Sequence, residues 1–147
     1  MPEEKSQFIY VTYIRTTADA LWSALTTPET MKKYWLGASM TTDWQPGSPW
    51  ALHLDDGRLA DTGEIVEIEA MKRIVLRWDH QFMPELKAEG TATCVIELEP
   101  TGSTVKLTVV HSIERADSKL IKAVSGGWPK ILSNLKSLLE TGQIAIE

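Results

Sequence analysis

The chain has 147 residues, of which 43% are hydrophobic, and its 15 basic against 20 acidic residues give a formal net charge of −5. This length and composition are typical of one folded domain, which we expect over residues 1–147 with an ordered core at about residues 8–142. The negative charge argues against nucleic-acid binding and against docking on anionic membranes. A single cysteine, Cys94, excludes an intramolecular disulfide. With no apolar leader and no membrane-length apolar run, the sequence predicts a cytoplasmic protein.

The N-terminal part of the chain predicts a strand followed by two short helices. Residues 8–14 are mostly β-branched or aromatic, which is typical of a strand. Thr16 or Thr17 can cap a first helix through its hydroxyl group. Pro28 suits the first turn of a second helix, which we expect to end at Tyr34.

The middle of the chain predicts a series of antiparallel strands. Apolar alternation and turn sequences place them at residues 39–44, 50–54, 62–70, 73–80, 92–99 and 105–113. In the third of these, Val66 and Ile68 form the apolar face. Residues 81–90, which include Pro84 and Gly90, are expected to form a loop. One apolar face on each strand predicts a sheet with one buried side.

The C-terminal part predicts a long helix. Apolar residues recur at steps of three and four between residues 120 and 138, and Asp117 or Ser118 can cap the start. Because Pro129 lacks a backbone N–H and would clash one turn back, we expect a kink or break near residues 125–129.

These elements together predict an α+β fold. The economical way to bury all the apolar faces is a curved antiparallel sheet of about six to seven strands wrapped around the C-terminal helix. Such a wrap tends to leave a space between the helix and the sheet.

Several short motifs occur in a fixed order over roughly residues 8–142. They are Ala20-Leu-Trp-Ser-Ala-Leu-Thr-Thr-Pro28, Tyr34-Trp35, Trp44-Gln-Pro-Gly47, Gly63-Glu-Ile-Val-Glu-Ile68, Arg73-Ile-Val-Leu-Arg-Trp78, and Gly127-Trp128 followed by Leu132, Leu135, Leu138, Leu139 and Glu140. In order and spacing they resemble the homologues of the activator of Hsp90 ATPase, within the START/Bet v 1-like superfamily. The resemblance implies a helix-grip fold with an internal cavity. Members of the superfamily include ligand carriers, cyclases and co-chaperone domains, so the fold leaves the function open.

The residues expected to line the cavity come from the apolar strand faces and the closing helix. They are Trp35, Met40, Leu76, Trp78, His80, Cys94, Val109, His111, Val124 and Trp128. His80 and His111 are also the candidates for acid–base chemistry, although an inward-facing histidine is more often a hydrogen-bonded part of the core. Histidine and cysteine spacing gives no metal site.

We therefore predict binding of a small hydrophobic molecule, without cofactor or metal. One alternative is a cyclase- or hydrolase-like enzyme that uses His80 or His111 in the same cavity. Another is a protein-interaction module of co-chaperone type that uses the outer surface of the sheet. The eukaryotic co-chaperone has an additional N-terminal domain that this chain lacks, so a chaperone partner is not expected; a homodimer is compatible with each hypothesis.

Overall fold

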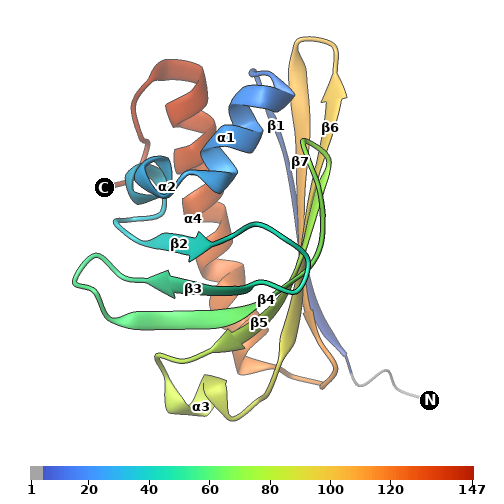
Figure 1. Ribbon diagram of the computed structural model, residues 1–147, viewed down its shortest axis with the longest axis vertical. Helices are drawn as coiled ribbons and strands as arrows, with labels where there is room; N and C mark the ends of the chain where they lie inside the picture. Colours follow the sequence, from blue (N-terminus) through green and yellow to red (C-terminus); the bar gives the residue numbers. More distant parts are fainter. Residues whose placement is uncertain (1–4) are drawn as a thin grey trace.

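Seven antiparallel strands form one strongly curved sheet in a computed structural model that describes residues 5–147. The strands are β1 (Ser6–Ile14), β2 (Ser39–Thr42), β3 (Pro49–His53), β4 (Leu59–Glu69), β5 (Arg73–His80), β6 (Ala92–Thr101) and β7 (Thr104–Ile113). Their order across the sheet is β1-β7-β6-β5-β4-β3-β2. In Figure 1, β2 and β3 run nearly across the direction of β1, β6 and β7, so the sheet forms a deep concave face.

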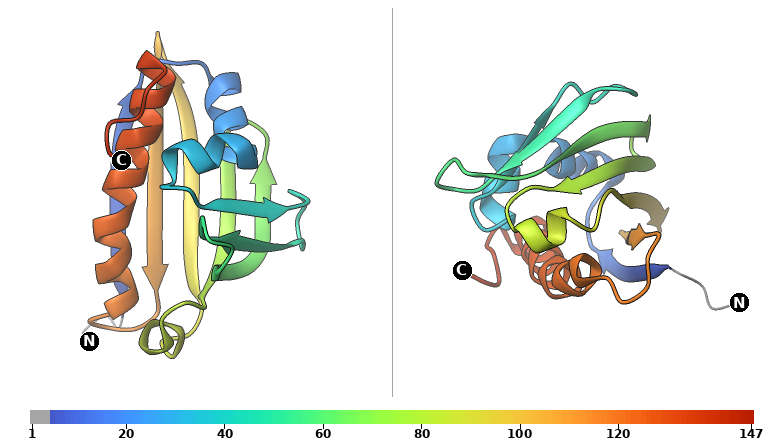
Figure 2. Two further views of the ribbon diagram at one scale, coloured as in Figure 1. Left: turned by 90° about the vertical axis from the view of Figure 1, so that its left-hand side faces the viewer. Right: turned by 90° about the horizontal axis from the view of Figure 1, so that it is seen from below.

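Three helices cover this concave face: α1 (Ala18–Thr26), α2 (Pro28–Tyr34) and α4 (Lys119–Thr141). The two views of Figure 2 show α4 alongside the long strands and no helix on the opposite, convex face. The arrangement is the α+β helix-grip fold expected from the sequence. None of the helices of residues 5–147 combines the length and the apolar character that a membrane span requires.

The helix ends follow the capping signals in the sequence. The Thr17 hydroxyl accepts a hydrogen bond from the backbone N–H of Ala20 at 3.1 Å, so Thr17 and not Thr16 caps α1. At the start of α4, the Ser118 hydroxyl accepts from the N–H of Ile121 at 3.1 Å. Both hydroxyls satisfy donors that the first helical turn leaves free.

Of the kink or break expected near residues 125–129, the break is wrong, because α4 is a single helix with Pro129 inside it. An interior proline costs roughly 3 kcal/mol. Leu120 and Trp128 before it, and Leu132 and Leu135 after it, are all buried. Each buried side chain contributes about 2 kcal/mol, so packing on both sides of Pro129 outweighs its cost.

Two other expectations for the middle of the chain need correction. The segment 81–90 contains a short helix, α3 (Pro84–Lys87), whose Leu86 is buried. In β4, a bulge between Ile65 and Glu67 shifts the register, so Ile65 faces the core while Val66 is 42% exposed. A bulge inserts one residue into the strand and reverses the alternation on its far side, which the apolar pattern alone does not reveal.

Candidate functional site

Indole rings pack against one another between α4 and the sheet. The ring centroid of Trp78 on β5 lies 4.7 Å from that of Trp50 on β3 and 6.0 Å from that of Trp128 on α4. Trp128 lies 5.3 Å from Trp35, which follows α2. Only Trp35 of these four is partly exposed. The rings therefore join strands β3 and β5 of the curved sheet to α4 and to the end of α2.

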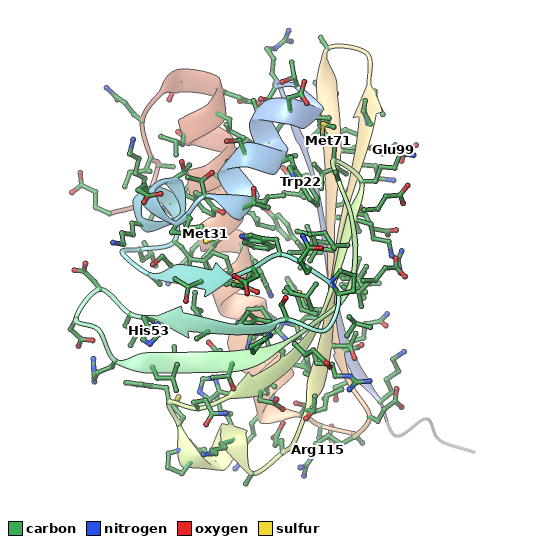
Figure 3. The ribbon with its side chains drawn as sticks, in the orientation of Figure 1. Trp22, Met31, His53, Met71, Glu99 and Arg115 are labelled. Atoms are coloured by element: carbon green, nitrogen blue, oxygen red, sulfur yellow. The ribbon has the colours of Figure 1, made fainter. Side chains whose placement is uncertain are left out.

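This packing leaves little room in the interior of the fold. The interior space is lined by Leu25, Met31, Tyr34, Trp35, Met40, Trp44, Ile74, Leu76, Trp78, Ile96, Leu107, Val109, Trp128 and Leu132, and its volume is about 20 Å³. In Figure 3, Met31 and Trp22 lie between the helices and the sheet, whereas Glu99 points away from them. A volume of this size holds about one water molecule, so a larger ligand must bind outside this interior space.

A larger pocket lies beside the interior space, between α4, α3 and strands β3 to β5. The α4 pocket has a volume of about 190 Å³ and is lined by Trp35, Leu52, Asp61, Trp78, His80, Leu86, Leu120, Ala123, Val124, Gly127, Trp128 and Ile131. Trp35, Trp78 and Trp128 line both spaces, so their rings form the wall between them. An apolar cavity of about 150 Å³ can bind benzene, and the α4 pocket has room for a ligand of at least that size.

The residues that the sequence singled out fall into four groups, the first being the three tryptophans that line both spaces. Met40, Leu76 and Val109 line only the interior space, and His80 and Val124 line only the α4 pocket. Cys94 and His111 are fully buried and line neither of these two spaces. Burial raises the pKa of the Cys94 thiol above its usual range, so the thiol is unreactive.

One of the two polar groups of the α4 pocket is a carboxylate on β4 that the sequence analysis did not identify. Asp61 Oδ1 accepts hydrogen bonds from Trp78 Nε1 at 2.8 Å and from His80 Nδ1 at 2.7 Å. Antiparallel pairing places Asp61 directly opposite His80, and Trp78 lies on the same face of β5. Burial raises the pKa of Asp61, and the hydrogen bond from Trp78, the electrostatic interaction with His80 and the hydrogen bond with His80 only partly offset this effect.

Both ring nitrogens of His80 are engaged. Nε2 accepts a hydrogen bond from the backbone N–H of Met83 at 3.1 Å, while Nδ1 contacts Asp61. A nitrogen that accepts cannot carry a proton, so the proton is on Nδ1 and the ring is neutral. His80 therefore connects Asp61 to the segment that leads into α3, and Nε2 is not free to act as a base.

His111 is held in a similar way deeper in the core. Its Nδ1 accepts a hydrogen bond from Trp128 Nε1 at 3.1 Å, and its Nε2 is buried without a hydrogen-bond partner among residues 5–147. Burial lowers the pKa of His111 to about 4. His111 thus supports Trp128, which lines the pocket, as a neutral hydrogen-bond acceptor.

Glu89, in the loop after α3, holds the start of α4, whose Leu120 lines the α4 pocket. Its carboxylate accepts hydrogen bonds from Ser118 Oγ at 2.5 Å, from Lys119 N at 2.8 Å and from Leu120 N at 3.2 Å, all at the start of α4. Although burial opposes the effect, these hydrogen bonds keep the pKa of Glu89 below its ordinary value. An acidic side chain at a helix N-terminus also interacts favourably with the helix dipole.

Two sequence signals could have led to Asp61. The first is the hairpin turn at residues 55–57, from which β4 begins at Leu59, three residues earlier than the strand we expected at Thr62. The second is the alternation of β4 before the bulge, which puts Asp61 on the same inward face as Ile65. Leu52 and Leu86 also line the pocket, but only the curvature of the sheet and the position of α3 bring them there.

Comparison with solved structures identifies relatives of the same shape. The Aha1 dimer from Colwellia psychrerythraea is similar with a TM-score of 0.74 and 20% identity, over 93% of this chain and 98% of that one. PFC0360w, an HSP90 activator from Plasmodium falciparum, is similar with a TM-score of 0.72 and 20% identity, over 90% and 95% of the two chains. CalU16 from Micromonospora echinospora has a TM-score of 0.74 and 19% identity, over 92% and 77%. At these identities the likeness shows the fold.

No curated protein matches the sequence. The family model described as "Activator of Hsp90 ATPase homolog 1-like protein" matches residues 15–140, which is most of the chain from the end of β1 to the last turn of α4. The matched region includes every residue that lines the α4 pocket. The chain therefore belongs to the Activator of Hsp90 ATPase homolog 1-like family, within the START/Bet v 1-like superfamily.

Proposed function

We propose that this protein binds a small, mostly apolar molecule in the α4 pocket. The observation that carries the proposal is the pocket itself, about 190 Å³ in volume, whose lining is aliphatic and aromatic apart from Asp61 and His80. Small-molecule sites usually combine such an apolar lining with a few fixed polar groups that orient the ligand. The hydrogen bonds at Asp61, His80 and Glu89 hold these groups and the start of α4 in place before a ligand arrives.

An enzyme that uses either histidine as its base finds less support. A general base needs a free nitrogen within reach of the substrate. The Nε2 atom of His80 accepts from the Met83 N–H, and His111 lines neither the interior space nor the α4 pocket. The hydrogen bonds of His80 and His111 are those expected of side chains that support the wall of a binding site.

The proposal is tested by titrating the protein with benzyl alcohol, which is neutral and slightly larger than benzene. The readout is the two-dimensional ¹H–¹⁵N spectrum, in which the six tryptophans give separate indole N–H signals. We expect the signals of Trp35, Trp78 and Trp128 to shift with saturation, because these rings line the pocket.

A matched pair of variants gives the control. Val124→Phe places a ring in the α4 pocket and should weaken binding at least about tenfold, since a bulky side chain then occupies the ligand's volume. Val66→Phe makes the same change on the exposed bulge of β4 and should leave the affinity unchanged. Equal effects of the two variants, or no saturable shift in the unmodified protein, would contradict the proposal.

A second candidate function, protein–protein interaction, is favoured by the convex face of the sheet. One apolar row crosses four neighbouring strands on that face. It consists of Ile9 on β1, Val110 on β7, Val95 on β6 and Val75 on β5, which are paired in register. Ile9 is 55% exposed, and no helix of residues 5–147 covers the row. Apolar surface of this kind commonly marks an interaction site.

We propose a second copy of this chain as the occupant. In a two-fold symmetric contact a patch faces itself, so the apolar row would pack on its equivalent, and the similar Aha1 from Colwellia psychrerythraea is described as a dimer. Sedimentation velocity over a range of concentrations tests this. Val110→Lys should abolish the dimer, whereas Ser112→Lys, next to it on the same face of β7, should weaken it less. A protein that is monomeric at all concentrations overturns the proposal.

A further inference from the structure

We infer that the ligand of the α4 pocket is a cationic amine, which pairs with Asp61. The inference rests on the proposed ligand-binding function and specifies the chemistry of the ligand. It begins with the free oxygen of the carboxylate. Oδ1 of Asp61 accepts both hydrogen bonds of the cluster, from Trp78 and from His80. Oδ2 has no hydrogen-bond partner among residues 5–147, the Asp61 side chain lines the α4 pocket, and 10% of that side chain stays exposed.

The second step is the charge of the cluster. Because His80 Nε2 accepts the Met83 N–H, His80 is neutral and does not balance a negative charge on Asp61. An imidazolium would place an N–H against the N–H of Met83. Trp78 contributes a neutral donor. The Asp61–His80–Trp78 cluster therefore carries one net negative charge when Asp61 is ionised.

The third step is the lack of a positively charged side chain beside Asp61. Among residues 5–147, no lysine or arginine lines the α4 pocket, and none forms an ion pair with Asp61. A buried carboxylate without a counter-ion is costly, because apolar surroundings do not replace its hydration. A ligand that brings a positive charge to Oδ2 would relieve this cost, whereas an anionic ligand would increase it.

The aromatic lining favours the same class of ligand. Trp35, Trp78 and Trp128 line the pocket that contains the carboxylate. The face of an indole ring attracts a cation, most strongly where water is excluded. A compact amine with an apolar ring would thus find a carboxylate acceptor, cation-attracting ring faces and an apolar surface in one site.

The test compares three probes that share a ring and differ in charge: benzylamine, benzyl alcohol and benzoate. Affinities are measured from the indole N–H signals of the full chain at neutral pH. A charge-assisted hydrogen bond to a partly buried carboxylate should make benzylamine bind at least about tenfold more tightly than benzyl alcohol. Benzoate should bind more weakly than the alcohol.

The variant Asp61→Asn identifies the group responsible. The amide keeps an acceptor oxygen for Trp78 and His80 but removes the charge, so the preference for benzylamine over benzyl alcohol should disappear. Asp43→Asn makes the same change at an exposed aspartate outside the pocket and should leave the preference intact. This control separates pairing with Asp61 from the general attraction of a cation to a chain of net charge −5.

The outcomes distinguish the inference from the proposed function beneath it. If benzyl alcohol binds as tightly as benzylamine, or if Asp61→Asn keeps the preference, the amine inference is overturned while ligand binding stands. If none of the three probes binds, both fall. The comparison of probes on the unmodified protein needs no variant, so a folding defect in Asp61→Asn would not leave the inference undecided.

Discussion

Gly63→Ala tests whether the aromatic wall behind the pocket requires a glycine on β4. A Cβ atom at Gly63 would overlap the backbone oxygen of Arg77 and lie 2.5 Å from Nε1 of Trp50. The Trp50 ring crosses β4 at this point and donates a hydrogen bond to the same Arg77 oxygen at 3.0 Å. The substitution must therefore displace either the ring or the strand, and Trp50 packs directly on Trp78.

The expected cost follows from two contributions. Extra volume in a packed core costs about 1–3 kcal/mol. Loss of the hydrogen bond from Trp50 to Arg77, with a buried group left unpaired, adds about 1–3 kcal/mol. We expect Gly63→Ala to lower the free energy of unfolding by about 3–5 kcal/mol, which corresponds to a fall in Tm of roughly 10 °C for a chain of this size.

Urea unfolding followed by tryptophan fluorescence measures this free energy. The control is Gly126→Ala on α4, where a Cβ atom would meet nothing within 4 Å. Because alanine favours the helix over glycine, this variant should gain about 0.5–1 kcal/mol. The same substitution is thus expected to have opposite signs at the two positions. A loss below about 1 kcal/mol for Gly63→Ala would refute the reasoning from the Trp50 contact.

Three further predictions concern other buried groups. His111 has a pKa of about 4 in the folded protein and about 6.5 when unfolded, so the unfolded chain takes up the proton first as the pH falls. Stability should therefore decrease below pH 6.5, by about 2 kcal/mol between pH 7.5 and 5, and His111→Gln should remove that part of the pH dependence in urea titrations; an unchanged slope would contradict it. Cys94, which is fully buried, should react with a thiol reagent only after unfolding, and rapid labelling of the folded protein would disprove this. Asn134→Ala should cost about 1–3 kcal/mol, because Asn134 Oδ1 accepts from the N–H groups of Ala145 and Ile146; hydrogen exchange should become fast at those two amides alone, and continued protection there would argue against the contact.

Local patterns were sufficient to predict most of the fold. Alternation placed β5 at its observed bounds, Arg73–His80, and hydroxyl caps located the starts of α1 and α4. These signals depend on neighbours within a few residues, so they can be read without the rest of the chain. The family resemblance predicted the helix-grip arrangement, and the family match confirms the family.

The wrong predictions concern features that depend on contacts between residues far apart in the sequence. Pro129 remains inside α4 because side chains on both sides of it pack on the sheet and on α2, an energy that the helix sequence alone does not express. The bulge at Val66 depends on how β4 pairs with β5. In each case tertiary packing outweighs a local preference of a few kcal/mol.

For the candidate site, the sequence alone determined that Trp78, His80 and His111 would face the apolar side of the sheet, because alternation sets which face a side chain takes. Only the tertiary structure decided how much room remains among them. The curvature of the sheet packs Trp50 on Trp78 and Trp78 on Trp128, and this packing nearly fills the interior. The position of α3 leaves the α4 pocket beside it. Strand pairing then places Asp61 opposite His80, 19 positions away in the chain. The volume of a pocket and the partners of a charged group both depend on residues that are far apart in the sequence. They are therefore decided only when the chain folds.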